Sequence, residues 1–363
     1  MPIQMKEIED AEINEVVSFH NLSYGDKRTP KKWIWEYKGN YPDLFVFTII
    51  KDNDKVVGTQ GMIPIYLNIG GETHLSAKSE SSLLDPKYRG GERFKELYDF
   101  AMTLCKARKM CCVWGFTGAV KVWRNKLGFS VYEDAMYISA LVLKPRPFIA
   151  SIRKSKQNMV IKTTESLAFM LRYLYSSVRR FTYFTYKFLK RTSREISIDQ
   201  RLRSVSDVSE LYKRLRAKYA DLIHIEQDEK YIAWRISNNP NVEYTTFFAY
   251  EDNLLRAYCY VALVNNREAY LSDLTFEDYE AGSFLLETIL NLFCRRKINS
   301  VNFIGNIRNP LMATVFNLLK KNGFIKRNFT PFVLKNISYT HEKCLHDIRN
   351  WYINGLWTEG YQF

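Results

Sequence analysis

A set of landmarks occurs twice, in the same order, along the chain. Trp35 stands seven residues before Pro42, and Trp234 stands six residues before Pro240. An Asp-Asn pair follows each tryptophan, and each series ends in a Gly-Phe pair about 90 residues after its tryptophan. The pairs are Asp52-Asn53 and Gly128-Phe129 in the first half, and Asp252-Asn253 and Gly323-Phe324 in the second. Such self-similarity indicates a duplicated domain, and the alternative is chance similarity between two α/β domains.

The chain is long enough for the two domains that a duplication requires. It has 363 residues, 46% of them hydrophobic, so each half can bury a core of its own. A formal net charge of +14 favours polyanionic partners, which include nucleic acids, anionic lipids and phosphorylated small molecules. Charge alone does not choose among them, and a solvated basic surface accounts for most of the lysines and arginines.

Hydrophobic periodicity predicts a mixed α/β domain over residues 1–143. The predicted order is helix 11–21, strands 44–50, 55–65 and 75–84, helix 94–108, strand 110–116, a short helix ending at Lys126, and strand 135–143. This order predicts an α/β fold of the α+β type with a mixed sheet. Because the landmarks recur, residues 201–363 are expected to form a second domain of the same kind.

The segment between these domains, residues 144–200, is basic and is predicted to be a helical linker. Residues 166–190 carry apolar side chains at helical spacing beside arginines and lysines. The apolar positions are Leu167, Met170, Leu171 and Leu174. The favoured interpretation is a connecting helix packed between the domains, with its basic side in water. An interfacial membrane helix is the alternative.

Cysteine usage and the amino terminus bear on the cellular compartment. The six cysteines include no CxxC pair and the five histidines are scattered, which indicates reduced cysteines and no metal site. Met1 is followed by Pro2 and mixed polar residues rather than by a signal peptide. No uncharged apolar run approaches the ~20 residues that span a bilayer. These features predict a cytoplasmic protein.

The most informative stretch, Ser79 to Leu97, is predicted to be a strand, a short glycine-containing loop and a helix. A loop that opens a helix turns backbone N–H groups outward at the positive end of the helix dipole, which suits a pyrophosphate. Gly90 and Gly91 permit close approach of the backbone, and Arg89 and Arg93 add positive charge.

Together with the order of the elements, this loop and the later Leu127-Gly128-Phe129 block resemble the GNAT superfamily of N-acyltransferases. In that family the loop reads Arg or Gln, two residues, Gly, one residue, then Gly or Ala, and it binds the pyrophosphate of acyl-CoA. Arg89 fits the first position, whereas Glu92 and Phe94 stand at the fourth and sixth. The tyrosine that usually acts as the acid just before the Gly-Phe pair is absent from residues 122–126.

The resemblance implies two tandem GNAT-like domains, of which the first binds acyl-CoA. The coenzyme-binding residues that it implies are Leu83, Leu84, Arg89, Gly90, Gly91, Arg93 and Phe94, the two leucines through backbone N–H groups. Glu80 lies on the strand before the loop, where many members of the family carry the general base. The alternative for Glu80 is a structural salt bridge.

The second domain is expected to build the acceptor pocket rather than a coenzyme site. Its loop, Asp278 to Phe284, lacks the arginine and carries acids that repel a pyrophosphate. Candidate acceptor contacts are His20, Asn21 and Tyr24 at the end of the first helix, and Asp273 and Asn306 in the second domain. Polar packing at the surface or in the core is the alternative for each of these five residues.

Two such domains, with a Trp…Pro signature in each and a basic linker, resemble the sugar N-acyltransferases of bacterial surface-polysaccharide pathways. The resemblance implies transfer of an acetyl or 3-hydroxybutanoyl group from acyl-CoA to the amine of a nucleotide-linked, dTDP-type amino-dideoxy sugar for O-antigen or capsule. It implies neither a metal nor a nucleic acid partner. A Fem-type transferase that uses aminoacyl-tRNA and a non-enzymatic membrane-surface scaffold are the alternatives. Peripheral membrane contact and a homodimer stay open.

Overall fold

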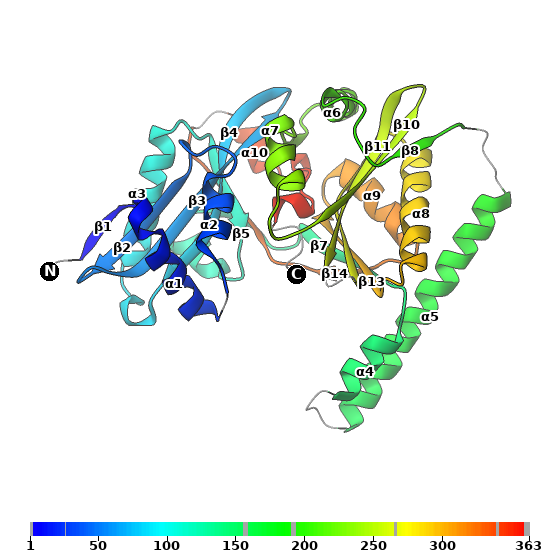
Figure 1. Cartoon of the computed structure of the whole chain (residues 1–363), viewed down its shortest axis with the longest axis horizontal. Helices are drawn as coiled ribbons and strands as arrows, with labels where there is room; N and C mark the ends of the chain where they lie inside the picture. The colour runs from blue at the N-terminus through cyan, green and yellow to red at the C-terminus, as the bar shows by residue number, and fades with distance from the viewer. Residues whose placement is uncertain are drawn as a thin grey trace. The chain divides into compact units, whose positions relative to one another are not determined.

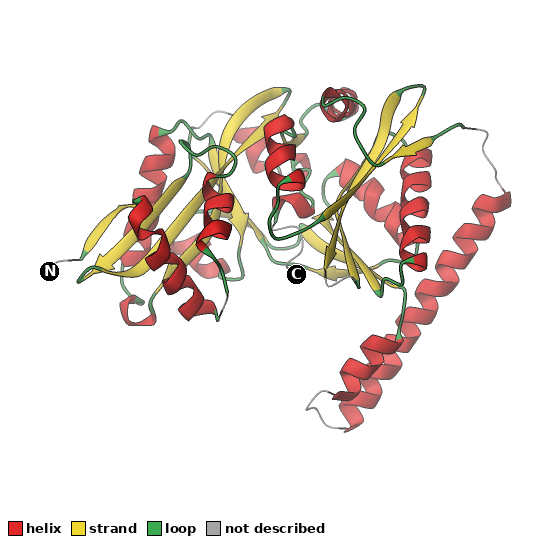
Figure 2. Ribbon diagram, viewed as in Figure 1, coloured by secondary structure: helices red, strands yellow, loops and turns green. Residues whose placement is uncertain are grey.

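The computed structural model describes residues 3–25, 27–154, 159–189, 194–264, 267–338 and 341–358. The chain forms two compact units. Unit 1 comprises residues 1–133, 220–241 and 330–350, and unit 2 comprises residues 134–219, 242–329 and 351–363. Each unit contains a mixed sheet with helices packed against it, so the predicted α/β fold is confirmed (Figure 2).

Unit 1 is built on a sheet with the strand order β1-β2-β3-β4-β5-β15-β6, and β9 pairs with β3. Figure 1 labels strands β1 to β5 of this sheet. The strands are β1 (Gln4–Glu7), β2 (Val46–Asp52), β3 (Lys55–Ile69), β4 (Glu72–Leu84), β5 (Cys112–Phe116), β6 (Ser130–Tyr132), β9 (Ile223–Ile225) and β15 (Phe332–Asn336). The helices are α1 (Ile13–Tyr24), α2 (Pro30–Lys38), α3 (Arg93–Ala107), α7 (Glu229–Ile232) and α10 (Glu342–His346), with the short turns η1 (Asp10–Glu12), η2 (Pro86–Tyr88), η3 (Val122–Lys126), η4 (Ala233–Ser237) and η5 (Ile348–Asn350).

Unit 2 has a sheet with the strand order β8-β10-β11-β12-β13-β7-β14. The strands are β7 (Met136–Val142), β8 (Ser197–Asp199), β10 (Tyr244–Glu251), β11 (Leu254–Val264), β12 (Glu268–Phe276), β13 (Ser300–Asn306) and β14 (Ile325–Asn328). The helices are α4 (Arg146–Lys154), α5 (Met159–Leu189), α6 (Ser206–Lys218), α8 (Tyr279–Arg295) and α9 (Pro310–Lys321), with the short turn η6 (Gly355–Trp357).

The two sheets share one plan, and each receives the strand that ends the other half of the sequence. β7 lies between β13 and β14 in unit 2, whereas β15 lies between β5 and β6 in unit 1. The strand predicted at residues 135–143 therefore forms, but it pairs in the second sheet. The units differ from the contiguous domains predicted over residues 1–143 and 201–363 because pairing with a distant strand leaves no local pattern in the sequence.

The repeated Asp-Asn pairs fall at matching hairpins, with Asp52-Asn53 offset by one residue from the turn that it marks. The β2–β3 and β10–β11 hairpins each turn through two successive residues with positive φ, Asn53-Asp54 and Asp252-Asn253, as in a type I′ turn. The two tryptophans, in contrast, do not occupy matching places in the two units. Trp35 and Trp234 both lie in unit 1, with ring centroids 5.6 Å apart. Each indole N–H donates to the carbonyl oxygen of the other tryptophan, at 3.2 and 2.8 Å.

The core of unit 1 forms where helix α3 packs on the sheet. Its buried side chains recur every three to four residues, at Leu97, Tyr98, Ala101 and Cys105, as the predicted helical spacing requires. Tyr98, Ala101 and Cys105 belong to a hydrophobic cluster that also contains Trp123 and Phe129, the second residue of the repeated Gly-Phe pair. The six cysteines are free, and four of them are buried, as expected for reduced thiols.

Helix α5 departs from the interpretation that the sequence favours. Its apolar face is exposed rather than packed, since Leu167, Leu171 and Leu174 are 61%, 59% and 52% exposed. The opposite side carries the contacts within unit 2, such as the hydrogen bond from the Ser176 hydroxyl to the Gly323 carbonyl. Among the helices within the described ranges, none is both long and apolar enough to cross a bilayer.

Candidate active site in unit 1

The site is formed where two neighbouring parallel strands of unit 1 separate. β4 pairs with β5 through Ala77–Val113 and Lys78–Trp114, and no later pair follows in the described sheet. On its other side, β4 stays paired with β3 as far as Leu84. Beyond Lys78, the edge of β4 that faces β5 therefore pairs with no strand of the described sheet and borders a gap.

A β-bulge in β4 lies at the start of this gap. Thr59 pairs with Leu83 and Gly61 pairs with Glu80, so Gln60 faces two residues, Ser81 and Ser82. Ser81 adopts a positive φ of 51°, a conformation that costs free energy for a residue other than glycine.

Buried side chains hold the bulge in place. The Ser81 hydroxyl accepts hydrogen bonds from the Tyr37 hydroxyl at 2.7 Å and from Arg28 Nη1 at 3.1 Å. The Ser82 hydroxyl donates to Gln60 Oε1, and Gln60 Nε2 donates to the Ser79 hydroxyl at 3.0 Å. Burial chiefly raises the pKa of Tyr37 to about 12, so its phenol remains a donor at neutral pH. The network compensates the backbone strain at Ser81.

A cavity of about 660 Å³ occupies the gap. Its walls come from the diverging strands, from the loop before α3 and from the turn after β5. The lining residues are Ser23, Tyr24, Ser79 to Leu84, Arg89, Gly90, Gly91, Phe94, Phe116 to Ala119, Val122, Trp123 and Lys126. The volume lies within the ~300–1,000 Å³ that is typical of small-molecule pockets.

One end of the cavity has the features of an anion site. Gly90 has a φ of +96°, which only glycine adopts readily, and no atom lies within 4 Å of the position of an added Cβ. Helix α3 follows directly, and its N-cap residue Glu92 makes no side-chain capping hydrogen bond. Arg89 and Lys126 supply two positive charges to the lining. Arg89 is oriented by a 2.9 Å hydrogen bond from its Nε to the Leu84 carbonyl oxygen.

Titratable groups line the same cavity. Glu80 forms an ion pair with Lys78, whose side chain is buried. Burial first, and then the negative charge of Glu80, raise the pKa of Tyr24, while Arg89 opposes the shift. Tyr24 is therefore a neutral hydrogen-bond donor beside a carboxylate. A hydrogen-bond donor, the Tyr24 hydroxyl, and a potential proton acceptor, the Glu80 side chain, therefore line the same cavity.

Comparison with known proteins finds a similarity over the first part of unit 1. Residues 4–131 match the profile of the family described as "Acetyltransferase (GNAT) domain". This part of unit 1 is thus similar to GNAT acetyltransferase domains. The sequence matches none of the curated proteins with which it was compared.

Solved structures extend the similarity of fold over most of the chain. A probable N-acyltransferase of unknown function from Enterococcus faecalis V583 aligns with a TM-score of 0.62 at 7% identity, covering 93% of this chain and 73% of that one. A GCN5-related N-acetyltransferase from Kribbella flavida aligns with a TM-score of 0.57 at 10% identity, covering 93% and 71%. A tandem GNAT protein from the clavulanic acid biosynthesis pathway aligns at 0.56 and 11% identity, covering 93% and 99%. The fold of this chain is thus a tandem GNAT fold.

The GNAT loop residues of the sequence prediction fall largely at the cavity. Six of the seven residues predicted to bind coenzyme line it, the exception being Arg93, whose guanidinium lies 5.5 Å from the Tyr88 ring centroid. Glu92, which departs from the family pattern, is exposed and lies outside the lining. Glu80 and Tyr24 also line the cavity.

Two predicted acceptor residues on α1 lie outside the cavity lining. Asn21 closes the loop after α1, because its side chain donates to the Arg28 carbonyl and accepts from the Arg28 N–H, both at 2.9 Å. The His20 ring lies beside the Tyr24 ring, with centroids 4.6 Å apart and planes tilted by 47°. Both side chains support the cavity wall rather than form it.

The two predicted acceptor residues of the second half are used inside unit 2. Asp273 is fully buried and accepts hydrogen bonds from the Tyr258 and Thr275 hydroxyls, at 2.7 and 2.8 Å. Asn306 is fully buried and donates to the Trp351 carbonyl at 2.8 Å. Core polar packing, the alternative given for these residues, explains their positions.

Sequence reasoning missed the serines of the bulge and the turn after β5. Ser81 and Ser82 carry no motif, and their role depends on the register between β3 and β4. Thr117 and Gly118 follow the predicted strand 110–116 directly, so their place at the end of a strand beside β4 was a usable signal.

Proposed function

We propose that unit 1 binds acyl-CoA in its cavity and transfers the acyl group to a primary amine. The observation that carries this proposal is the cavity between the diverging strands β4 and β5, which ends at a glycine loop with Arg89 at a helix N-terminus. Backbone N–H groups of the loop and the two cationic side chains would bind the pyrophosphate. The chain of the coenzyme would then run along the open edge of β4, past Leu83 and Leu84, which line the cavity.

The transfer requires a neutral amine, a proton acceptor and stabilisation of an oxyanion. The amine nitrogen attacks the thioester carbonyl carbon, and the carbonyl oxygen takes the negative charge near backbone N–H groups of the bulge. The intermediate collapses as the C–S bond breaks, and an amide and a CoA thiolate result. Glu80 takes the proton of the attacking amine, directly or through water, and Tyr24 donates a hydrogen bond to the acceptor. The thiolate takes a proton from solvent or from a neighbouring hydroxyl.

Replacing Glu80 by Gln tests its role. If the carboxylate is the base, kcat falls by about 10²–10⁴-fold while CoA affinity and the melting temperature change little. If Glu80 is only the partner of Lys78, Glu80→Gln and Lys78→Met lower the melting temperature alike and leave kcat near that of the wild type. Release of free thiol from acetyl-CoA measures turnover, and thermal unfolding measures the second effect.

The acceptor that we propose is the amine of a nucleotide-linked amino-dideoxy sugar, with acetyl or 3-hydroxybutanoyl as the acyl group. The strongly basic chain suits two substrates that each carry a pyrophosphate, since the net charge is +14. A panel of dTDP- and UDP-linked aminosugars, assayed with both acyl-CoAs, tests this assignment. If CoA raises the melting temperature but no sugar is acylated, the coenzyme assignment stands and the sugar assignment is wrong. If tRNA stabilises the protein and CoA does not, a Fem-type reaction replaces both.

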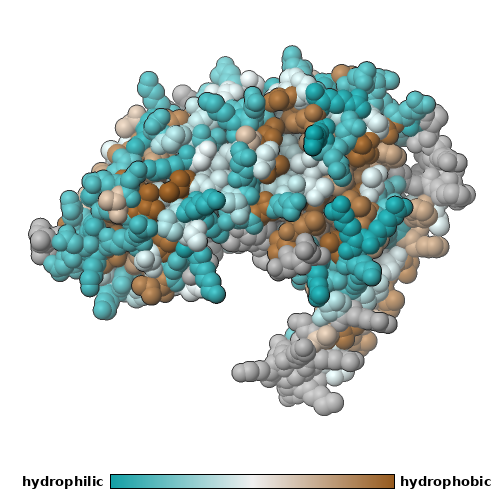
Figure 3. Space-filling model, in the orientation of Figure 1, coloured by the Kyte–Doolittle hydropathy of each residue, from teal (hydrophilic) through white to brown (hydrophobic). Residues whose placement is uncertain are grey.

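Helix α5 supports a second role, peripheral contact with an anionic membrane surface. Seven of the fourteen large hydrophobic side chains that are exposed in the described residues lie on this one helix. They are Leu167, Leu171, Leu174, Tyr175, Val178, Phe181 and Phe184. Five of them follow one another at spacings of four and three residues, which forms a continuous apolar face, and brown side chains are visible along this helix in Figure 3.

Charge favours lipid over a second copy of the chain as the occupant of this face. Residues 144–190 contain eleven Lys or Arg and one Glu, so this short segment contributes +10 of the net charge of +14. Two copies would bring these charges together, whereas anionic headgroups would neutralise them.

Liposome flotation tests this contact. The protein should float with vesicles of phosphatidylcholine and phosphatidylglycerol but not with phosphatidylcholine alone, and Leu174→Glu with Phe181→Glu should abolish binding. Leu254→Glu, at an exposed leucine of β11, is the matched control. Dimerisation that the same double variant abolishes, without flotation, would instead assign the face to a second copy.

A further inference from the structure

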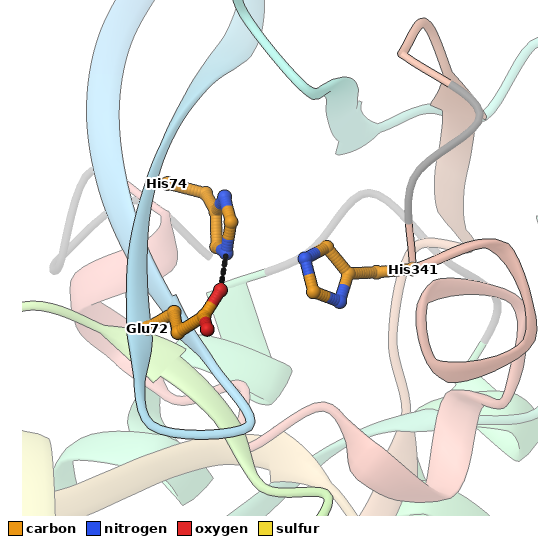
Figure 4. A group of neighbouring side chains, drawn as sticks. All are labelled: Glu72, His74 and His341. Carbon is orange, nitrogen blue, oxygen red and sulfur yellow. Dashed lines mark ion pairs between the residues drawn. The ribbon is translucent and has the colours of Figure 1, made fainter.

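Two histidines and a glutamate from distant parts of the sequence meet in unit 1. Glu72 and His74 lie at alternate positions of β4, so both side chains leave the same face of the strand. His341 lies 267 residues after His74 and stands just before α10. Figure 4 shows the three side chains directed toward one another. One potential ligand atom from each residue lies within 4.8 Å of the other two.

Hydrogen bonding within unit 1 leaves this cluster incompletely satisfied. His74 Nε2 lies 3.5 Å from Glu72 Oε2, is buried, and forms no hydrogen bond with the described residues. The His74 and His341 rings lie with their centroids 4.5 Å apart.

We infer that Glu72, His74 and His341 form a binding site for a zinc-type divalent ion. Two imidazole nitrogens and one carboxylate oxygen are a protein ligand set that leaves a fourth tetrahedral position for water. In such a site the ligand atoms lie about 3.3 Å apart, so the present separations must shorten. Glu72 and His341 are exposed and can move, while the half-buried His74 fixes the centre.

The position of the cluster, outside the cavity of unit 1, favours a structural role for the ion although three protein ligands leave one position open. None of the three residues lines the cavity of unit 1. Glu72 and His74 follow the β3–β4 turn, whereas His341 belongs to residues 330–350, the late segment of the chain that returns to unit 1 and supplies β15. An ion bound by all three would fasten this returning segment to the β3–β4 hairpin. The separation of the ligands in sequence explains why residue spacing predicts no metal site.

Titration of the untagged full chain with ZnCl2 by calorimetry tests the inference. We expect one site per chain in the wild type, and His341→Ala and His74→Ala should weaken binding by more than the ~10–100-fold that loss of an outer-shell partner costs. Substitution of Co²⁺ should give the intense visible absorption of a four-coordinate ion. Zinc should also raise the melting temperature of the wild type but not of either variant.

The matched control is His346→Ala, which removes a histidine of the same segment that contacts Ser130 instead of the cluster. This variant should bind zinc as the wild type does. Equal zinc affinity in the wild type and His341→Ala would overturn the inference, and so would a loss of binding in His346→Ala alone. Binding of CoA, measured on the same variants, is independent of this outcome and tests the proposed function separately.

Discussion

In unit 1 the helix that follows the diverging strand β4 begins at an open glycine loop, whereas its counterpart in unit 2 begins at a side chain that caps it. Glu92 makes no side-chain capping hydrogen bond at the start of α3. Asp278, at the equivalent place before α8, accepts hydrogen bonds from the N–H groups of Glu280 and Ala281, both at 3.0 Å. The donors that a pyrophosphate would need in unit 2 are therefore bound by a carboxylate of the protein.

Arg194 completes this closure. Its guanidinium donates to Asp278 at 2.8 Å and to Glu280 at 3.2 Å, and it also pairs with Glu251. Burial alone would raise the pKa of Asp278, but the hydrogen bonds with Arg194 and with backbone N–H groups outweigh it and lower the pKa. The cap stays negatively charged at neutral pH and repels another anion.

The gap between diverging strands is closed in unit 2 as well. β12 and β13 pair as far as Leu271–Phe303, as β4 and β5 do over a short stretch in unit 1. Beyond that point, residues 351–358 contact both strands: Tyr352 bonds to Leu274, and the N–H of Asn306 bonds to the Ile353 carbonyl. The same architecture thus holds a cavity in one unit and a buried peptide segment in the other. The comparison teaches that one copy of a duplicated fold can lack a binding cavity because another segment of the chain occupies the space between the strands.

The largest effect should come from emptying this filled gap. Trp351 is fully buried and its ring contacts Trp357, with centroids 5.6 Å apart. Trp351→Ala should lower the free energy of unfolding of unit 2 by about 3–5 kcal/mol, because the deletion leaves a large cavity. Urea unfolding followed by circular dichroism measures the loss. Stabilisation by CoA should persist in this variant, and its disappearance would contradict the assignment of coenzyme to unit 1.

The next effect concerns the open loop of unit 1. Arg89→Ala should weaken CoA binding by about 10–100-fold, since a hydrogen bond to a charged group is worth about 1.5–3 kcal/mol. Calorimetry with CoA measures the change. Arg93→Ala is the matched control, because Arg93 stacks on Tyr88 outside the cavity lining and should bind CoA as the wild type does. Equal losses in the two variants would mean that net charge, rather than the cavity, governs affinity.

These differences also mark what the sequence could predict. Helix α3, its loop and the strand before it have local patterns, so their positions and six of the seven coenzyme residues at the cavity follow from periodicity and motif. The exchange of β7 and β15 and the filling of unit 2 by residues 351–358 depend on contacts between distant segments. The same applies to Asn306, which the sequence offers as an acceptor contact. Its side-chain amide donates to the carbonyl of Trp351, which lies 45 residues away in the sequence.

A smaller effect should follow from removing the cap in unit 2. Asp278→Ala should lower the stability of unit 2 by about 0.5–2 kcal/mol, the usual cost of losing an N-cap. Because the folded pKa of Asp278 lies below the ordinary value of 3.8, the charged cap stabilises the fold fully above that pH and loses its effect as the pH falls through the folded pKa. The difference between wild type and variant, measured by urea unfolding, should therefore shrink below about pH 3.8.

Asp278→Asn separates capping from charge, because asparagine also caps helices well. It should retain most of the stability at pH 7 and lose the pH dependence. If removal of Asp278 created a second CoA site, then the cap alone would close unit 2. We expect one site per chain in both variants, since residues 351–358 still occupy the gap between β12 and β13.

The smallest effect is expected at the glycines of the open loop, where the cost of backbone conformation can be separated from the cost of a steric clash. Gly90→Ala meets no neighbouring atom, so its cost of about 1 kcal/mol comes from a φ of +96° alone. Gly91→Ala also meets open space but has no such φ, so it should leave stability unchanged or slightly higher. Thermal unfolding with and without CoA measures both variants. If Gly90→Ala lowers CoA affinity and Gly91→Ala does not, the left-handed turn positions the anion-binding amides; equal behaviour would show that the loop binds CoA through its side chains instead.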